Sequence, residues 1–163
     1  DESWHQFGNK EELKSDFGNA NSIIKEIIEN TDKPNKWGLF DIKFIKNWAS
    51  EKALIIGDAA HPMSPSYGQG ANCAMEDAII LSRIILSKSN FEGNLSYFQK
   101  NRGGRVKKLQ KGSLRNLKVF HIKNPPLKFV IHSGLYVLNK IIPIILMQSS
   151  WIYKFNAFNV KIK

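Results

Sequence analysis

The chain has 163 residues, of which 42% are hydrophobic and 23% charged, a balance typical of one globular domain rather than of a disordered protein. Its single cysteine, Cys73, excludes an internal disulfide framework and a cysteine-based zinc site. The first twenty residues are polar, so we predict no signal peptide and expect a cytoplasmic location. Because the chain starts at Asp1 rather than at Met, we expect an N-terminus created by truncation or processing.

Charge is distributed unevenly along the chain, whose net charge is +10. Residues 1–92 contain ten Lys and Arg and all fourteen Asp and Glu, which gives 10 − 14 = −4. Residues 93–163 contain fourteen Lys and Arg and no acid, which gives +14. The basic part therefore predicts a negatively charged partner, which is a membrane surface, a nucleic acid or another part of the protein.

The first half of the chain predicts one helix and two strands. Apolar residues at helical spacing, among them Leu13, Phe17, Ile24 and Ile28, predict an amphipathic helix over residues 10–30. Alternation over residues 37–45 predicts one half-buried strand. The short apolar run over residues 53–56 ends at a glycine, which favours a buried strand of a parallel sheet.

The second half reads as helical. After a loop rich in glycine, proline and serine, apolar spacing predicts a helix from residue 70 to residue 86. A basic helix is predicted over residues 94–118, with a kink or a break at Gly103–Gly104 because each glycine costs about 1 kcal/mol relative to alanine. The Asn-Pro-Pro sequence at 124–126 ends it. Polar residues interrupt the apolar segment 127–147, so we predict no membrane-spanning helix.

The residues between these elements suggest a ligand site. Asp58 directly follows the predicted strand, at the sheet edge where α/β proteins bind ligands, and its carboxylate can accept hydrogen bonds from ligand hydroxyls. Residues 68–70 lead into a helix whose free N–H groups, near Ala71 and Asn72, can stabilise negative charge. This arrangement suits a nucleotide-like cofactor, although strand–loop–helix units with glycines also occur without any ligand.

The order of these residues resembles the second FAD-binding motif of the flavin-dependent aromatic hydroxylases, the single-component monooxygenases of the para-hydroxybenzoate and salicylate hydroxylase type. The matching strings are Gly57-Asp58-Ala59-Ala60-His61, Pro65-x-x-Gly68-Gln69-Gly70-x-Asn72 and Glu76-Asp77-Ala78. The similarity extends more loosely to Trp48, which precedes the motif by a short turn. It also extends to a later helix that carries Tyr97, Arg102, Arg105 and Leu109, with one extra residue before the first arginine, and to a C-terminal aromatic pair, Trp151 and Tyr153.

The resemblance implies a cofactor site made of Asp58, Pro65, Gly68, Gln69, Gly70, Ala71 and Asn72. In it, Asp58 would bind the ribityl chain of FAD, Pro65 would line the flavin ring, and the amides of residues 70–72 would face its N1–C2=O edge. The implied chemistry is reduction of FAD by NADH or NADPH, formation of a flavin hydroperoxide with O2, and oxygen transfer to an aromatic or related small molecule. No catalytic side chain and no metal site is assigned.

The resemblance also implies the architecture, an α/β fold that is mostly helical with a few strands and that forms the C-terminal part of a two-domain, Rossmann-like FAD-binding monooxygenase. Residues 1–47 would end the substrate domain, residues 48–88 would belong to the FAD-binding domain, and residues 89–163 would form a basic helical region. The chain lacks the family's Gly-x-Gly-x-x-Gly turn and its Asp-Gly motif. We therefore expect the missing N-terminal half as a partner, and poor FAD binding by the chain alone.

Several residues and the basic half have simpler interpretations. We expect His61 to orient its loop by a hydrogen bond, Glu76 and Asp77 to be structural because adjacent helix positions point apart, and Cys73 to pack. The basic half is expected to dock on the missing half, or else to contact a membrane peripherally, or to bind nucleic acid, for which it has no recognisable module. The alternatives to an enzyme are a non-catalytic remnant and a basic module that binds membrane surfaces.

Overall fold

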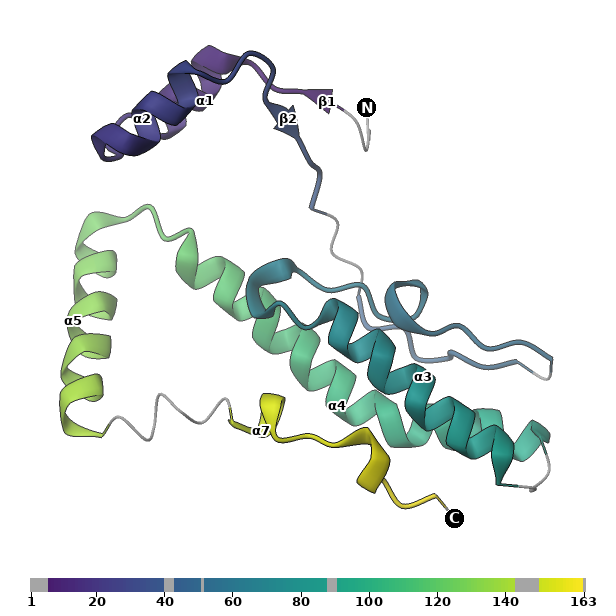
Figure 1. The fold of residues 1–163 in the computed structure, drawn as a ribbon. Coiled ribbons are helices and arrows are strands. Elements are labelled where there is room, and N and C mark those ends of the chain that lie inside the picture. Colours follow the sequence, from purple (N-terminus) through teal and green to yellow (C-terminus); the bar gives the residue numbers. More distant parts are fainter. Residues whose placement is uncertain (1–5, 40–42, 51, 88–90, 143–149, 163) are drawn as a thin grey trace. The chain divides into compact units, whose positions relative to one another are not determined.

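The computed structural model describes residues 6–39, 43–50, 52–87, 91–142 and 150–162 (Figure 1). The chain divides into two compact units, Asp1–Leu39 and Phe40–Lys163. Helices dominate the described residues, whose strands form one two-stranded sheet. This agrees with the predicted fold class, mostly helical with a few strands. The domain boundaries predicted after residues 47 and 88 stay predictions.

The first unit contains two helices where apolar spacing predicts one. Helix α1 (Lys10–Asp16) and helix α2 (Ser22–Glu29) are separated at residues 17–21, so the prediction of a single helix over 10–30 is wrong. The reason is the side chain of Asn21, which accepts a hydrogen bond from the Ile24 amide at 3.0 Å and caps a new helix. Lys14 of α1 pairs with Glu29 of α2 at 3.0 Å, which holds the two helices together.

Strand β1 (Gln6–Phe7) pairs antiparallel with strand β2 (Asn35–Lys36), just before the predicted strand over 37–45. Residues 37–39 and 43–45 are not strand, so that prediction is wrong for them, and residues 40–42 lie outside the described part of the chain. The buried strand predicted over 53–56 is also wrong. Only a single antiparallel bridge forms there, between Leu54 and Ala49, and Ile55 is 38% exposed. A strand needs a ladder of neighbours, and an apolar run does not supply one.

The second unit is built around two helices, α3 (Gly70–Leu86) and α4 (Phe91–Phe120). Helix α3 has the predicted bounds, and the loop before it contains two short 3-10 turns, η1 (Gly57–Ala59) and η2 (Pro65–Tyr67). The Trp48 ring lies 5.2 Å from the His61 ring and 6.2 Å from the Phe98 ring, which ties the approach segment to this core. The buried core residues are Trp48, Ala60, Cys73, Ile80, Ile84, Phe98, Val106, Leu109, Ile152 and Ala157.

Helix α4 continues through the glycine pair, so a break at Gly103–Gly104 is wrong and the alternative of a kink stays a prediction. A Cβ on Gly103 would lie 3.6 Å from Cζ of Phe44, so the small residue allows that ring to approach the helix. On either side of the pair, Arg102 and Arg105 form ion pairs with α3. These ion pairs to α3 stabilise the helix by more than the low helix propensity of the two glycines destabilises it.

The C-terminal region begins with helix α5 (Pro125–Ile141), whose first turn is capped by the side chain of Asn124 at 3.0 Å from the Leu127 amide. The predicted stop at 124–126 is thus confirmed, and residues 143–147 of the predicted apolar segment lie outside the described residues. Helix α7 (Ser150–Tyr153) and the turn η4 (Ala157–Asn159) return to α3, where Arg83 donates to the Ala157 carbonyl at 2.8 Å. None of the described helices is both long and apolar enough to cross a bilayer.

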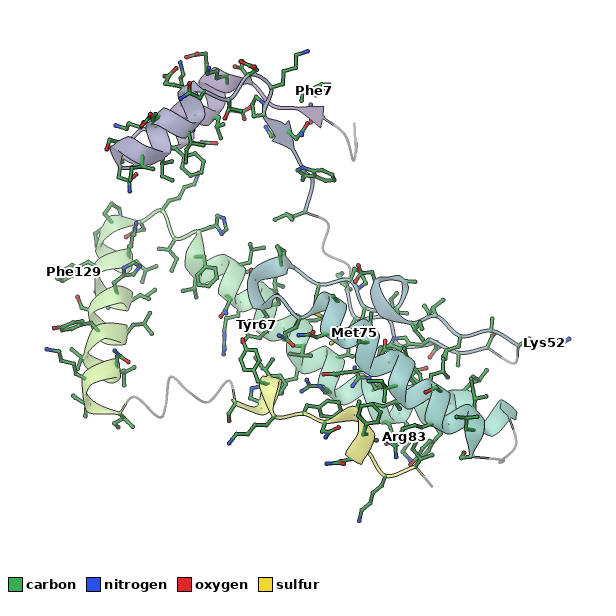
Figure 2. The ribbon with its side chains drawn as sticks, in the orientation of Figure 1. Phe7, Lys52, Tyr67, Met75, Arg83 and Phe129 are labelled. Carbon is green, nitrogen blue, oxygen red and sulfur yellow. The ribbon has the colours of Figure 1, made fainter. Side chains whose placement is uncertain are left out.

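A tight contact joins the loop to α4 at Tyr67, which Figure 2 labels. A Cβ on Gly112 would lie 2.5 Å from Cε2 of Tyr67 and 2.6 Å from its hydroxyl oxygen. Glycine at 112 therefore makes room for the Tyr67 ring against the helix. A Cβ on Gly104, in the same helix, would meet no atom within 4 Å.

These two glycines should respond in opposite ways to alanine. We expect Gly104→Ala to stabilise the chain by about 0.5–1 kcal/mol, because alanine is the better helix former and has free space there. Gly112→Ala should destabilise it by about 1 kcal/mol or more, because the Tyr67 ring must leave its place. Urea unfolding of both variants measures the difference. In a Tyr67→Ala background the penalty at residue 112 should disappear; a penalty that persists there would show that Tyr67 is not its cause.

Candidate functional site

The predicted site begins at Gly57, where the backbone takes a positive φ of 57°. A Cβ on Gly57 would lie 3.3 Å from Cβ of Ala74, so glycine allows the turn η1 to approach α3 closely. This places Asp58 at the start of α3, where its Oδ1 atom is 3.8 Å from the Cβ position of Gly70. The Asp58 carboxylate is exposed and has no hydrogen-bond partner among the described residues, so it is available to a ligand.

The middle of the loop is fixed by hydrogen bonds to α4. The Ser113 hydroxyl donates to the Ser64 carbonyl at 2.5 Å, and the two serine hydroxyl oxygens lie 2.8 Å apart. The Gln110 amide nitrogen donates to the Pro62 carbonyl at 2.8 Å. Pro65 follows directly after this anchored segment and is exposed. A helix far along the sequence therefore sets the position of the loop that carries Pro65.

Helix α3 begins with open hydrogen-bond donors. Gly68 takes the left-handed conformation, φ 62° and ψ 27°, that turns the chain into the helix. Gln69 is 5% exposed and does not cap the helix with its side chain. The first amide to bond back is that of Cys73, which donates to the Gln69 carbonyl at 2.9 Å. The preceding amides of residues 70–72 have no carbonyl one turn earlier, as at any helix start, and the first-turn residues Ala71 and Asn72 are exposed.

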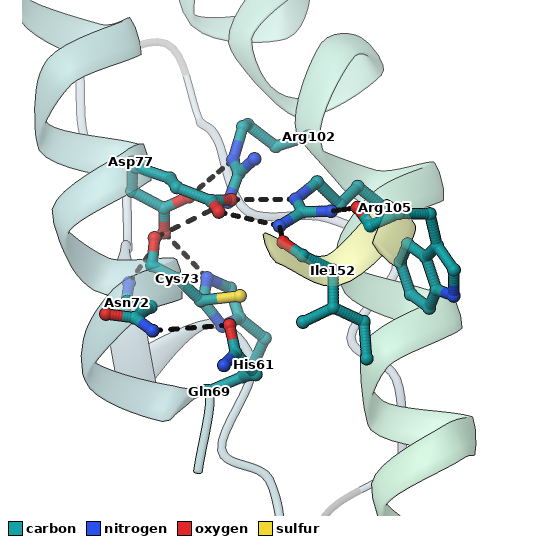
Figure 3. Close-up of polar contacts among 11 residues, drawn as sticks. His61, Gln69, Asn72, Cys73, Asp77, Arg102, Arg105 and Ile152 are labelled. Carbon is teal, nitrogen blue, oxygen red and sulfur yellow. Dashed lines mark hydrogen bonds and ion pairs between the residues drawn. The ribbon is translucent and has the colours of Figure 1, made fainter. Parts of the chain in front are cut away.

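A buried carboxylate, that of Asp77, holds this arrangement together (Figure 3). Its Oδ2 atom accepts from the Gly57 amide at 3.0 Å and lies 2.6 Å from Nε2 of His61. Its Oδ1 atom accepts from Nε of Arg102 at 2.7 Å. Burial opposes ionisation of Asp77, but the hydrogen bonds from His61 and Gly57 and the Arg102 charge prevail, so the pKa of Asp77 lies below its usual value. The expected loop-orienting hydrogen bond of His61 is confirmed.

A second ion pair connects α3 with α4, and its arginine also binds the C-terminal segment. Glu76 accepts from both Nε and Nη2 of Arg105, at 2.9 and 2.7 Å, which is a bidentate pair. Arg105 also donates to the carbonyls of Trp151 and Ile152 at 3.1 and 2.9 Å, and its guanidinium lies 4.0 Å from the centre of the Phe155 ring. Glu76 also pairs with Arg102, whose Nη2 lies 2.8 Å from its Oε2, so the two adjacent acids share Arg102 and Glu76 alone binds Arg105. The structural role expected for both acids is confirmed.

Sequence reasoning did not assign these arginine partners. The available signal was two arginines three residues apart in α4 together with two adjacent acids in α3. Cys73 is fully buried, as expected, and burial raises the pKa of its thiol to about 11, so it is a packing residue rather than a nucleophile. Among the described residues, no group of His, Cys, Asp and Glu could hold a metal ion.

The predicted site residues do not all face one hollow. A groove of about 570 Å³ lies along α3 beside residues 152–158, and Gln69 and Asn72 are among its lining residues. Asp58 and Pro65 do not line it. The Asn72 side-chain amide donates to Oε1 of Gln69 at 3.3 Å, which connects these two groove residues. The structure thus brings Asp58 to the start of α3 and leaves the assignment of Pro65 to the cofactor site a prediction.

The buried pair of Asp77 and Arg102 should dominate the stability of the second unit. Because both side chains are 1% exposed or less, we expect Arg102→Met to lower the free energy of unfolding by about 3–5 kcal/mol, since it leaves an uncompensated buried carboxylate. Arg115→Met in the same helix is the matched control, because Arg115 is exposed, and it should change stability by less than about 0.5 kcal/mol. Equal effects of the two variants in urea unfolding would contradict this role.

Acid should remove this stabilisation with a definite sign. The pKa of Asp77 is lower in the folded chain than in the unfolded chain, so its contribution is complete above the unfolded value of about 3.9 and is lost as the pH falls through the folded value. We therefore expect the stability difference between the wild type and Asp77→Asn to be constant from about pH 7 to 5 and to shrink below about pH 4. A difference that grows on acidification would reverse the assigned pKa direction.

Comparison with known proteins places this geometry in a family. The family model described as FAD binding domain matches residues 8–104, more than half of the chain. The 3-amino-4-hydroxybenzoate 2-monooxygenase PtnB3 of Streptomyces platensis is 29% identical over 157 residues, which are 96% of this chain and 38% of that protein. The 6-hydroxynicotinate 3-monooxygenase of Pseudomonas fluorescens is 31% identical over 109 residues, 66% of this chain and 28% of that protein.

Solved structures show the same fold. A salicylate hydroxylase in a substrate complex matches with a TM-score of 0.79 at 22% identity, over 97% of this chain and 38% of that one. HpxO of Klebsiella pneumoniae, complexed with FAD and uric acid, matches with a TM-score of 0.66 at 21% identity, over 85% of this chain and 39% of that one. The chain thus spans well under half the length of these proteins. It belongs to the family of FAD-dependent aromatic monooxygenases.

Proposed function

We propose that this chain supplies the part of an FAD-dependent monooxygenase that binds the ribityl and flavin portions of the cofactor. The observation that carries the proposal is the pairing of an exposed, unpartnered Asp58 carboxylate with the open amides at the start of α3. A carboxylate accepts hydrogen bonds from sugar-like hydroxyls, and a helix start donates to groups that carry negative charge. FAD has both kinds of group.

The residues present fit this cofactor. Gly57 and Gly68 take positive φ values, and glycine lets the backbone of this loop approach a ligand closely. The side chain of Gln69 does not cap α3, so the amides of its first turn stay open to a ligand. When bound, FAD supplies the redox and oxygen chemistry of the reaction. In our proposal Asp58 holds the ribityl hydroxyls, and the amides of residues 70–72 orient the ring and stabilise its negative charge.

The family supports a proposal for the wider activity. We propose that the enzyme takes electrons from NADH or NADPH and uses O2 to hydroxylate an aromatic or heteroaromatic small molecule in the cytoplasm. Two of the similar proteins have names that specify a hydroxylated aromatic acid, 3-amino-4-hydroxybenzoate and 6-hydroxynicotinate, and this supports the substrate class. The missing N-terminal half is proposed as the physical partner that completes the cofactor and substrate sites. Pro65 is proposed to line the flavin ring.

The role of Asp58 can be tested by flavin content. We expect Asp58→Ala, in a product expressed together with the upstream coding sequence of the same reading frame, to weaken FAD binding by about tenfold or more. The reason is the loss of a charge-assisted hydrogen bond worth about 1.5–3 kcal/mol. Purification followed by flavin absorbance and FAD titration measures the change. The 163-residue chain expressed alone should hold little flavin.

Asp32→Ala is the matched control, because Asp32 is exposed in the first unit and has no ion pair among the described residues. It should leave flavin content unchanged. NADH or NADPH oxidation in the presence of a panel of hydroxylated aromatic acids then tests the monooxygenase activity. A wild-type product that folds but contains no flavin and binds none would contradict the proposal and favour a non-catalytic remnant.

A further inference from the structure

One turn of helix α4 carries a buried serine, Ser113, that contacts the loop before α3. Ser113 is 0% exposed and Ser64 of the loop is 9% exposed, so protein groups rather than solvent have to satisfy their hydroxyls. Because such a hydrogen bond replaces one to water, it adds only a small net stability. What the pair fixes is geometry, since it sets where the loop lies against a helix residue 49 positions later in the sequence.

The distances show which hydroxyl donates to which oxygen. The Ser113 hydroxyl oxygen lies 2.5 Å from the Ser64 carbonyl oxygen and 2.8 Å from the Ser64 hydroxyl oxygen. A carbonyl oxygen only accepts and a hydroxyl has a single proton, so the Ser113 proton goes to the carbonyl and the Ser64 hydroxyl donates to Ser113. The Ser66 hydroxyl oxygen lies farther from that of Ser64, at 3.4 Å. Ser113 thus forms one bond with the main chain of the loop and one with a side chain, and each can be removed separately.

The carbonyl that Ser113 binds belongs to the peptide group that leads into Pro65. Peptide groups are planar, so a hydrogen bond to the carbonyl oxygen also orients the proline nitrogen at the other end of the bond. The pyrrolidine ring itself fixes the next rotation, φ of Pro65, at about −65°. The Ser64 backbone is extended, with φ −60° and ψ 150°, as the residue before a proline prefers. The direction in which the Pro65 ring faces is therefore set from α4 through the Ser113 hydroxyl.

The other end of the turn η2 rests on the same part of α4. The ring of Tyr67, labelled in Figure 2, occupies the space that a side chain at Gly112 would need, because a Cβ there would lie 2.5 Å from Cε2 of the ring. The Gly68 amide donates to the Pro65 carbonyl at 2.8 Å and closes the turn. Pro65 thus lies between two contacts with neighbouring residues of α4, while its own side chain stays exposed.

We propose that Ser113 is a positioning residue for the flavin ring, on which it acts through the Ser64–Pro65 peptide group. The inference rests on the proposed function, in which Pro65 lines that ring. Ser113 is fully buried, so it does not itself meet the cofactor. Its hydrogen bond holds the pyrrolidine ring in one orientation, and this orientation determines how closely the proline packs on the flavin and how much water reaches the ring there.

The ribityl side of the proposed site is held from a different helix. Asp77 of α3 binds the Gly57 amide at 3.0 Å, directly before Asp58, whereas Ser113 of α4 binds the loop at Ser64. Loss of the Ser113 hydroxyl should therefore change the surroundings of the flavin ring and leave the affinity for FAD nearly unchanged. This separation distinguishes a positioning role from a general loss of stability, which would weaken FAD binding as well.

Ser113→Ala and Ser64→Ala are the matched pair that tests the proposal, in the product expressed with the upstream coding sequence. Each removes one hydroxyl from the same buried pair, but only Ser113→Ala removes the bond to the Ser64 carbonyl. We expect Ser113→Ala to shift the visible absorption bands of bound FAD. In the cofactor-free product it should speed hydrogen exchange of the Gly68 amide by about threefold to tenfold, because the turn loses an anchoring hydrogen bond. Ser64→Ala should match the wild type in both measurements, and both variants should keep the dissociation constant of FAD within about threefold.

A steric variant reaches the same turn by another route. Gly112→Ala forces Tyr67 away from α4 and should also shift the flavin bands, whereas Gly104→Ala has free space in the same helix and should not. Circular dichroism checks that each variant folds, and if Ser113→Ala does not fold, unchanged bands in Gly112→Ala overturn the inference. Wild-type bands in folded, flavin-bound Ser113→Ala, or equal shifts in Ser113→Ala and Ser64→Ala, would overturn it while the proposed function stands. A folded wild-type product that binds no FAD would overturn both.

Discussion

The bond between the Asp77 carboxylate and the Arg102 guanidinium is the interaction on which the rest of the second unit depends. The Asp77 carboxylate forms hydrogen bonds with the amide of Gly57, the ring of His61 and the side chain of Arg102, which come from three different segments. A buried charge is stable only when it is paired and hydrogen-bonded, so removing one partner leaves the Asp77 carboxylate with an uncompensated desolvation cost. The exposed Asp58 owes its position to this buried neighbour network, because Gly57 precedes it directly.

The basic half of the chain is divided between internal and external roles. Arg102 and Arg105 are buried or nearly so and form ion pairs with Asp77 and Glu76 of the mildly acidic half. Most of the lysines beyond them are exposed. Two arginines of α4 therefore fasten this helix to α3, and the remaining positive charge is carried largely by exposed lysines of α4 and α5.

Local patterns predicted the parts of the fold that local interactions decide. Helix α3 was recovered with its bounds, because its apolar spacing and the glycine before it are both sequence features. The strand over 53–56 failed because a strand depends on a neighbour, and the break at Gly103–Gly104 failed because the ion pairs of Arg102 and Arg105 override propensity. At the site, the motif located Asp58 and the helix start, whereas the arginine partners required knowing which helix packs on α3.

Contacts with distant parts of the sequence also fix the conformation of the loop that carries the proposed cofactor site. Residues 57–72 contain little regular structure, and a loop with two positive-φ glycines has no stiffness of its own. Its stiffness comes from two helices: Asp77 of α3 binds Gly57 and His61 at one end, and Ser113, Gln110 and Gly112 of α4 contact residues 62–67 farther along. A ligand-binding loop held by both helices keeps its exposed carboxylate and amides in a fixed relation, so that ordering them upon binding costs little free energy.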